Sequence, residues 1–264
     1  MMGLSLFFDP LFRLPLAAGV LVALALPPIG LLLRLRGEWL AALGLAHLAA
    51  ASALAGLAVG IPAVLGGPLG ALAGALAKGL GRARGNTAYA FMILTGWVLT
   101  LLIAANTPLG AAMGHALVDG QLYLAGPIQL AAAAVLALLA LAALPWLTPH
   151  LVRARFFPRN EAANRQPAWR WHLGFDLLVA LGMAVATATV GLMGAFALVL
   201  VPAWAAFRLA AGWRLALVIS IGGGSLGYLL AFALALALDQ PFGPVLVAVL
   251  LIGALPVLLR RRPG

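Results

Sequence analysis

The stretch Val190-Gly-Leu-Met-Gly-Ala-Phe-Ala-Leu-Val-Leu-Val-Pro-Ala-Trp-Ala-Ala-Phe-Arg208 decides how this chain folds. An apolar run enters it from Asp176, is interrupted by two glycines, and reaches Pro202. Glycine lowers helix stability and proline removes a backbone donor, so one straight helix through the whole stretch is not expected. We predict a bent membrane segment, followed by a short helix over 202–212 at the cytoplasmic surface. The side chains predicted to contact a partner there are Pro202, Trp204, Phe207 and Arg208.

The composition is that of an all-α, polytopic membrane protein. Apolar residues make up 65% of the chain and charged residues 8%, whereas soluble domains carry about 25% charged residues. Apolar stretches of about 20 residues, the length that a helix needs to cross a bilayer, recur throughout. We therefore expect 1–264 to form a single transmembrane domain. The chain has no cysteine, which excludes disulfides and thiolate metal sites.

Basic residues alternate from loop to loop, and this alternation sets the expected topology. Three loops, at 60–68, 107–121 and 239–244, contain no Lys or Arg. Because basic residues concentrate in cytoplasmic loops, the remaining loops are assigned to the cytoplasm. The formal charge of +10 therefore reflects topology, and we expect no nucleic-acid partner. The basic clusters lie at 34–36, 78–84, 153–170, 208–214 and 260–262.

The segment 174–201 must go up through the membrane and come back, because the basic residues on both sides of it are assigned to the cytoplasm. We place the reversal near Gly191–Gly194. Each arm is short for a full span, so the sequence allows either about eight transmembrane helices with one broken or re-entrant segment, or nine crossings. A re-entrant arm is possible only where protein covers its backbone.

Glycines spaced four residues apart could bring helix backbones close together. They occur at Gly56 and Gly60, and again at Gly66, Gly70 and Gly74. Small residues at this spacing favour close packing between membrane helices. Glycine and alanine are abundant throughout this chain, so the spacing could equally be incidental.

Ionisable side chains deep in a membrane usually mark function, and this chain has few of them. We place all six acidic residues at loop or span ends, which disfavours a self-powered secondary transporter. His47 falls inside the second span, where it could face a path, bind a metal or hydrogen-bond a neighbouring helix. One imidazole is too few for a metal site, so the residues alone favour the structural role.

No nucleotide-binding or cofactor-binding motif is present. The stretch Gly81-Arg-Ala-Arg-Gly-Asn-Thr87 lacks the lysine and spacing of a phosphate-binding loop. No arrangement of residues typical of a hydrolase is found, and we expect the chain to be neither an enzyme nor the holder of a cofactor. If the chain takes part in pumping, another subunit supplies the energy.

Four stretches of this sequence resemble the permease family of zinc/manganese-type ABC importers, and the resemblance covers about 8–258. The first is Gly30-Leu-Leu-Leu-Arg-Leu-Arg36 with Gly44-Leu-Ala-His47, which is similar to the first span and a helix bearing Ser-His. The second, Phe157-Pro158-Arg-Asn-Glu161-Ala-Ala163, resembles a Phe-Asp-Pro-Glu-x-Ala loop. The third is the stretch 190–208. The fourth, Asp239-Gln-Pro-Phe-Gly243-Pro244, matches an Asp-x-Pro-x-Gly-Pro turn.

The resemblance implies an ABC importer permease fold in the bacterial cytoplasmic membrane. It implies that two permease copies pair around a central path. Two cytoplasmic ATP-binding subunits would contact the short helix after Pro202, and these subunits would hydrolyse the ATP. A periplasmic or lipid-anchored substrate-binding protein would deliver a divalent cation. The loop 151–173 would lie in the cytoplasm.

The sequence departs from the family where the metal would be handled. Leu43 stands where the family has an Asp one helical turn before His47, and Gly85-Asn86 replaces a Glu-Asp pair. The implied metal-handling carboxylate is therefore absent, and His47 is left as the candidate metal residue. The cargo could be a metal ion, a metal chelate or a non-metal compound. A non-transporting membrane scaffold is the remaining alternative.

Overall fold

The computed structural model describes residues 10–80, 85–107, 120, 122–164 and 167–259, and within these ranges the chain is helical with no strand. Nine of the described helices are long and apolar enough to cross a membrane. Two short elements, η1 and α8, lie between them. The elements are α2 (Pro10–Arg36), α3 (Trp39–Ala58), α4 (Ala63–Leu80), α5 (Asn86–Asn106), η1 (Leu122–Leu124), α7 (Pro127–Phe156), α8 (Asn160–Ala163), α9 (Ala168–Val190), α10 (Leu192–Leu209), α11 (Trp213–Leu238) and α12 (Phe242–Leu259).

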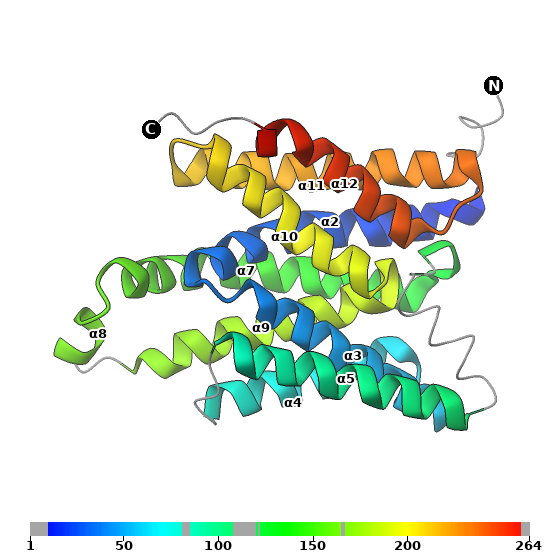
Figure 1. Cartoon of the computed structure of the whole chain (residues 1–264), viewed down its shortest axis with the longest axis horizontal. Helices are drawn as coiled ribbons and strands as arrows, with labels where there is room; N and C mark the ends of the chain where they lie inside the picture. Colours follow the sequence, from blue (N-terminus) through cyan, green and yellow to red (C-terminus); the bar gives the residue numbers. More distant parts are fainter. Residues whose placement is uncertain (1–9, 81–84, 108–119, 121, 165–166, 260–264) are drawn as a thin grey trace.

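Successive long helices run in opposite directions, so the loops gather at two ends of the bundle (Figure 1). The end at the left of Figure 1 holds α8 and the last turns of α2, α7, α10 and α12. Most of the described basic residues lie in these turns or in the α7–α9 connection, so we expect this end to face the cytoplasm and call it the cytoplasmic end. The opposite end holds the turns between α3 and α4, α9 and α10, and α11 and α12.

The chain reverses at Gly191, which separates α9 from α10 (Figure 1). Gly191 has φ 85° and ψ 160°, a conformation that is essentially confined to glycine. Helices of 23 and 18 residues are about 34 and 27 Å long, close to the hydrocarbon thickness of about 30 Å. Both arms are thus long enough to cross, and nine crossings are the alternative that the structure supports.

The prediction of a separate short helix over 202–212 is wrong. α10 continues through Pro202 to Leu209, and only Ala210 to Gly212 separate it from α11. The proline removes one hydrogen bond, but packing on α2 holds the helix: a methyl group on Gly30 would overlap the Val199 carbonyl oxygen. Close packing with α2 outweighs the local preference for a break.

Four of the five evenly spaced glycines pack α4 tightly against α3. A Cβ at Gly66 would lie 2.9 Å from the Ser52 carbonyl oxygen, and one at Gly70 would overlap the Ser52 hydroxyl. That hydroxyl accepts the Gly70 N–H at 3.1 Å and donates to the Gly67 carbonyl at 3.1 Å. Gly60 is different, because it has φ 82° in the turn after α3 and has no neighbour within 4 Å of its Cβ position.

Candidate functional site

The last two turns of α10 bring three of the predicted coupling residues together at the cytoplasmic end. Phe207 and Arg208 are exposed, and Trp204 is half-buried beneath the arginine. The Arg208 guanidinium lies 4.6 Å from the centre of the Trp204 ring, a cation–π distance. Pro202, the fourth predicted residue, is buried inside the helix and does not reach the surface.

Arg208 also ties α10 to the end of α12. Its Nη1 donates to the carbonyl oxygens of Val257 (3.3 Å) and Leu258 (3.5 Å). The last carbonyls of a helix have no partner within the helix and carry partial negative charge, so a cation is favourable there. The corner formed by 204–212, which we call the α10–α11 corner, is therefore fixed in position although its side chains are exposed.

A recess beside the α10–α11 corner joins it to the end of α7. The recess has a volume of about 390 Å³ and combines arginine and aromatic side chains. Phe207 forms part of its wall, and the Arg34 guanidinium lies 5.6 Å from the centre of the Phe207 ring. The other lining residues are Leu35, Gly37, Trp39, Arg155 and Phe156.

The predicted cytoplasmic loop is shorter than 151–173, because α7 extends to Phe156 and α9 begins at Ala168. Pro158 is exposed in this connection. Glu161 lies on α8, with its carboxylate 3.7 Å from Nε2 of His172. The roles of Pro158 and Glu161 in binding a partner stay predictions.

A buried cluster of four charges joins four helices at the same end, and it was not predicted. Lys78 Nζ, on α4, lies 2.7 Å from Asp176 of α9 and 3.0 Å from Glu38 at the start of α3. Arg36, at the end of α2, lies 2.6 Å from Glu38 and 3.1 Å from Asp176. Two positive and two negative charges therefore balance. Lys78 is 1% exposed and Asp176 3% exposed.

The positive charges of the cluster favour the ionised form of Glu38. Burial alone raises the pKa of Glu38, but Arg36 and Lys78 outweigh it and bring the pKa below its ordinary value. The sequence correctly places Glu38 at a span end, but Asp176 lies eight residues after the start of α9, and the sequence does not show that the two carboxylates meet. The sequence offers only a weak indication of the cluster: basic and acidic residues both occur near the cytoplasmic ends of the predicted spans.

His47 lies in the middle of α3, away from the charged cluster and the α10–α11 corner. Its Nδ1 is 2.9 Å from the Leu43 carbonyl oxygen. Because that oxygen can only accept, Nδ1 carries the proton and Nε2 keeps a lone pair. α5 packs closely against the backbone here, with the Cβ position of Gly96 2.5 Å from the His47 carbonyl carbon. No group of three His, Cys, Asp or Glu that could hold a metal is found among the described residues.

At the opposite end of the bundle, the predicted Asp239–Pro244 turn is shorter than expected, because α11 ends at Leu238 and α12 already begins at Phe242. Asp239 takes the left-handed conformation, with φ 51° and ψ 49°, directly after α11. The Gln240 N–H then donates to the Ala235 carbonyl at 3.0 Å and closes the helix end. Gly243 is buried and Pro244 is exposed in the first turn of α12.

Known proteins share this fold. The chain superposes on PsaBC from Streptococcus pneumoniae, solved in complex with a Fab, with a TM-score of 0.85 and 15% identity, covering 99% of this chain and 96% of that one. It superposes on a metal-chelate type ABC transporter in an inward-facing conformation with a TM-score of 0.69 and 16% identity, covering 93% and 84%. These likenesses show an ABC importer permease fold. No curated protein matches the sequence.

The sequence also matches the model of a protein family over nearly its whole length. The match spans residues 9–261, and the family is described as the ABC 3 transport family. The matched region includes the α9–α10 reversal, the charged cluster and the turn at Asp239. The chain is therefore a multi-pass membrane protein that belongs to the ABC 3 transport family.

Proposed function

We propose that this chain is the permease subunit of an ATP-driven importer for a divalent metal in the bacterial cytoplasmic membrane. It pairs with a second copy of itself, and cytoplasmic ATP-binding subunits hydrolyse the ATP that drives transport. A periplasmic or lipid-anchored substrate-binding protein delivers the cargo. Family membership, the permease fold and the resemblance of four sequence stretches to zinc/manganese-type permeases support this proposal.

The observation that carries the proposal is the exposed surface of the α10–α11 corner. Phe207 is 39% exposed on the cytoplasmic face, beside a recess of about 390 Å³ that contains further aromatic side chains. Aromatic and arginine side chains are enriched in protein–protein contacts, because they bury a large area and also make polar interactions. Arg208 connects this surface to the end of α12 by two hydrogen bonds, so a movement of the ATP-binding subunit would be passed to α10 and α12.

Co-purification tests the partner surface. We expect Phe207→Ala to weaken association with the ATP-binding subunit by tenfold or more, since central interface aromatics cost about 2 kcal/mol or more when truncated. Trp169→Ala is the matched control, because Trp169 is an exposed aromatic residue at the cytoplasmic start of α9, outside the recess. Unchanged association of the Phe207 variant, or an equal loss in both variants, would overturn the proposed surface.

We propose that His47 contacts the metal ion as the ion passes through the permease. Its free Nε2 is a suitable ligand atom, and the Leu43 carbonyl orients the ring as outer-shell partners of metal-binding histidines do. His47→Gln should reduce uptake of zinc or manganese, whereas His150→Gln, a change at a ring stacked on Trp171, should not. Leu43→Asp should increase metal affinity, because it adds a carboxylate one turn away. Normal metal uptake by the His47 variant would contradict this role.

A chelated metal is the second candidate cargo. Leu43 supplies no carboxylate for a bare cation, and one structural neighbour is a metal-chelate type transporter. Uptake assays with free and chelated metal in a strain that lacks the chain separate the two cargoes. If neither form is taken up while the ATP-binding subunit still associates, the cargo is not a metal.

A further inference from the structure

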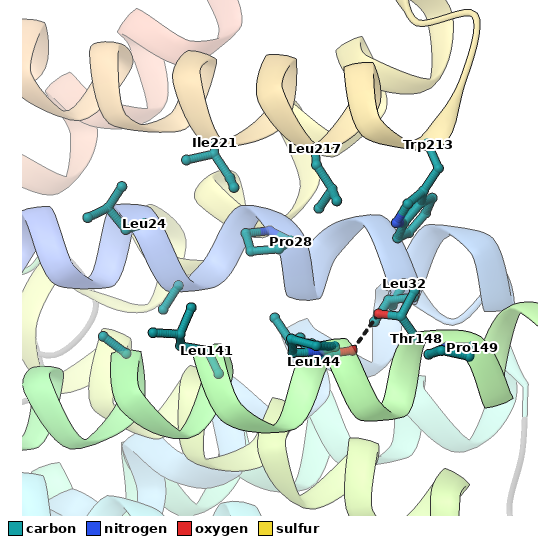
Figure 2. Close-up of a pocket in the computed structure, with 14 residues that line it drawn as sticks. Leu24, Pro28, Leu32, Leu141, Leu144, Thr148, Pro149, Trp213, Leu217 and Ile221 are labelled. Atoms are coloured by element: carbon teal, nitrogen blue, oxygen red, sulfur yellow. Dashed lines mark hydrogen bonds between the residues drawn. The ribbon is translucent and has the colours of Figure 1, made fainter.

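A membrane-facing groove lies between α2, α7 and α11, on the cytoplasmic half of the bundle (Figure 2). Its volume is about 590 Å³, within the range of ligand-binding pockets. α2 forms the floor with Pro28 and Leu32, while α7 lines one side with Leu141 and Leu144 and α11 lines the other with Leu217 and Ile221 (Figure 2). Leu141 is 74% exposed, so the groove opens to the surroundings of the bundle.

The groove offers an almost wholly apolar surface. Thr148 carries the one hydroxyl among the lining residues, and it donates to the Leu144 carbonyl of its own helix at 2.6 Å, as drawn in Figure 2. No carboxylate or amide side chain lines the space. A polar metal cargo is therefore not a suitable occupant, because its charge would be desolvated without ligands.

The length of the groove matches one leaflet of a bilayer. Its wall on α7 runs from Ala137 to Pro149, twelve residue steps that rise about 18 Å. Half of a hydrocarbon core is about 15 Å thick. Trp213 lies at the cytoplasmic end of the groove, a depth at which the amphipathic indole is favoured in membranes (Figure 2).

An arginine lies near the cytoplasmic end of each wall of the groove. Arg34 comes two residues after Leu32, Arg153 four residues after Pro149, and Arg214 directly after Trp213. Arg153 and Arg214 are exposed, and none of the ion pairs found within the described ranges involves either of them. Basic groups between membrane helices on the cytoplasmic side are suited to anionic lipid headgroups.

We infer that this groove binds an anionic phospholipid of the cytoplasmic leaflet. An acyl chain lies between α7 and α11 against Pro28 and Leu32, and the phosphate lies near Arg153 and Arg214. A second copy of the chain fits less well, because paired permeases keep their cytoplasmic ends on the same side. The arginines of two copies would then meet, and like charges repel. The lipid would fill the groove and hold α7 at a fixed distance from α11.

Native mass spectrometry of the purified chain tests the inference without using transport. The probes are phosphatidylglycerol and phosphatidylcholine with the same acyl chains. We expect selective retention of phosphatidylglycerol, and about thirtyfold weaker binding in the double variant Arg153→Gln/Arg214→Gln. Arg159→Gln removes an exposed arginine of the α7–α9 connection and should bind as the parent does. Equal retention of both lipids, or unchanged binding by the double variant, would overturn the inference.

A second pair of variants tests the groove itself. Ala137→Phe places a ring in the groove and should reduce retention of the lipid, whereas Leu138→Phe changes a neighbouring, 66% exposed position outside it. Equal retention by both variants would place the lipid elsewhere. Because the chain has no cysteine, Leu141→Cys gives a single thiol. A disulfide between two copies through this thiol in membranes would show that the partner copy, rather than a lipid, occupies the groove.

Discussion

Replacing Lys78 by methionine should be among the most destabilising single changes in this protein. Lys78 is 1% exposed, and its Nζ lies 2.7 Å from Asp176 and 3.0 Å from Glu38. Methionine fills a similar volume, so the change removes the charge with little loss of packing. The buried carboxylate of Asp176 and the partly buried one of Glu38 would then share the single positive charge of Arg36. Breaking a buried ion pair from one side costs about 3–5 kcal/mol.

Unfolding of the purified protein by a denaturing detergent, followed by circular dichroism, measures this loss. Arg159→Met is the control, since it removes an exposed positive charge and should change the free energy of unfolding by less than about 0.5 kcal/mol. The double variant Lys78→Met/Asp176→Asn restores a balanced cluster. It should be more stable than the sum of the single changes predicts, by roughly 1–3 kcal/mol. A loss below about 1 kcal/mol in Lys78→Met would refute the buried cluster as a tie between helices.

Three further predictions follow from single positions. The pKa of Glu38 is lowered in the folded state, so its ionised carboxylate adds to the free energy of unfolding above the unfolded pKa, and this stabilisation is lost as the pH falls through the folded pKa. Measurements of the free energy of unfolding at decreasing pH should show the loss, and the Glu38→Gln variant should not show it. Gly191→Ala should cost about 1–3 kcal/mol in the same unfolding assay, because alanine is strained at φ 85°, whereas Gly212→Ala, at φ −160°, should cost less. Asp239→Ala should destabilise by about 1 kcal/mol and Asp239→Asn should be nearly neutral, since asparagine tolerates the left-handed conformation; equal effects would contradict the turn geometry.

The sequence predicts which helix ends lie together, because the loops rich in arginine and lysine gather at one end of the bundle. It also predicts the reversal in the α9–α10 segment, since only glycine adopts the conformation found at Gly191. It fails at Pro202, where a local preference for a helix break is opposed by packing of Gly30 against the Val199 carbonyl. That packing depends on residues far apart in the chain.

The charged cluster shows the same limit more clearly. Lys78 is separated by 40 positions from Glu38 and by 98 positions from Asp176. Each residue, taken alone, resembles an ordinary interfacial charge at the end of a span. Only the packing of α2, α3, α4 and α9 shows that these ends meet inside the protein. His47 is an intermediate case: the sequence places it within a span, and the structure adds the hydrogen bond to Leu43 that fixes its ring.

The proposed function requires the α10–α11 corner to face the cytoplasm and to contact an ATP-binding subunit. Ala211→Cys in this cysteine-free chain places a thiol at an exposed position of the corner and leaves Phe207 unchanged, so both properties can be measured with a membrane-impermeant maleimide. We predict that the thiol is labelled in inside-out vesicles, is not labelled in right-side-out vesicles, and is protected when the ATP-binding subunit is present. Labelling from the outside, or equal labelling with and without the ATP-binding subunit, would contradict the proposed function.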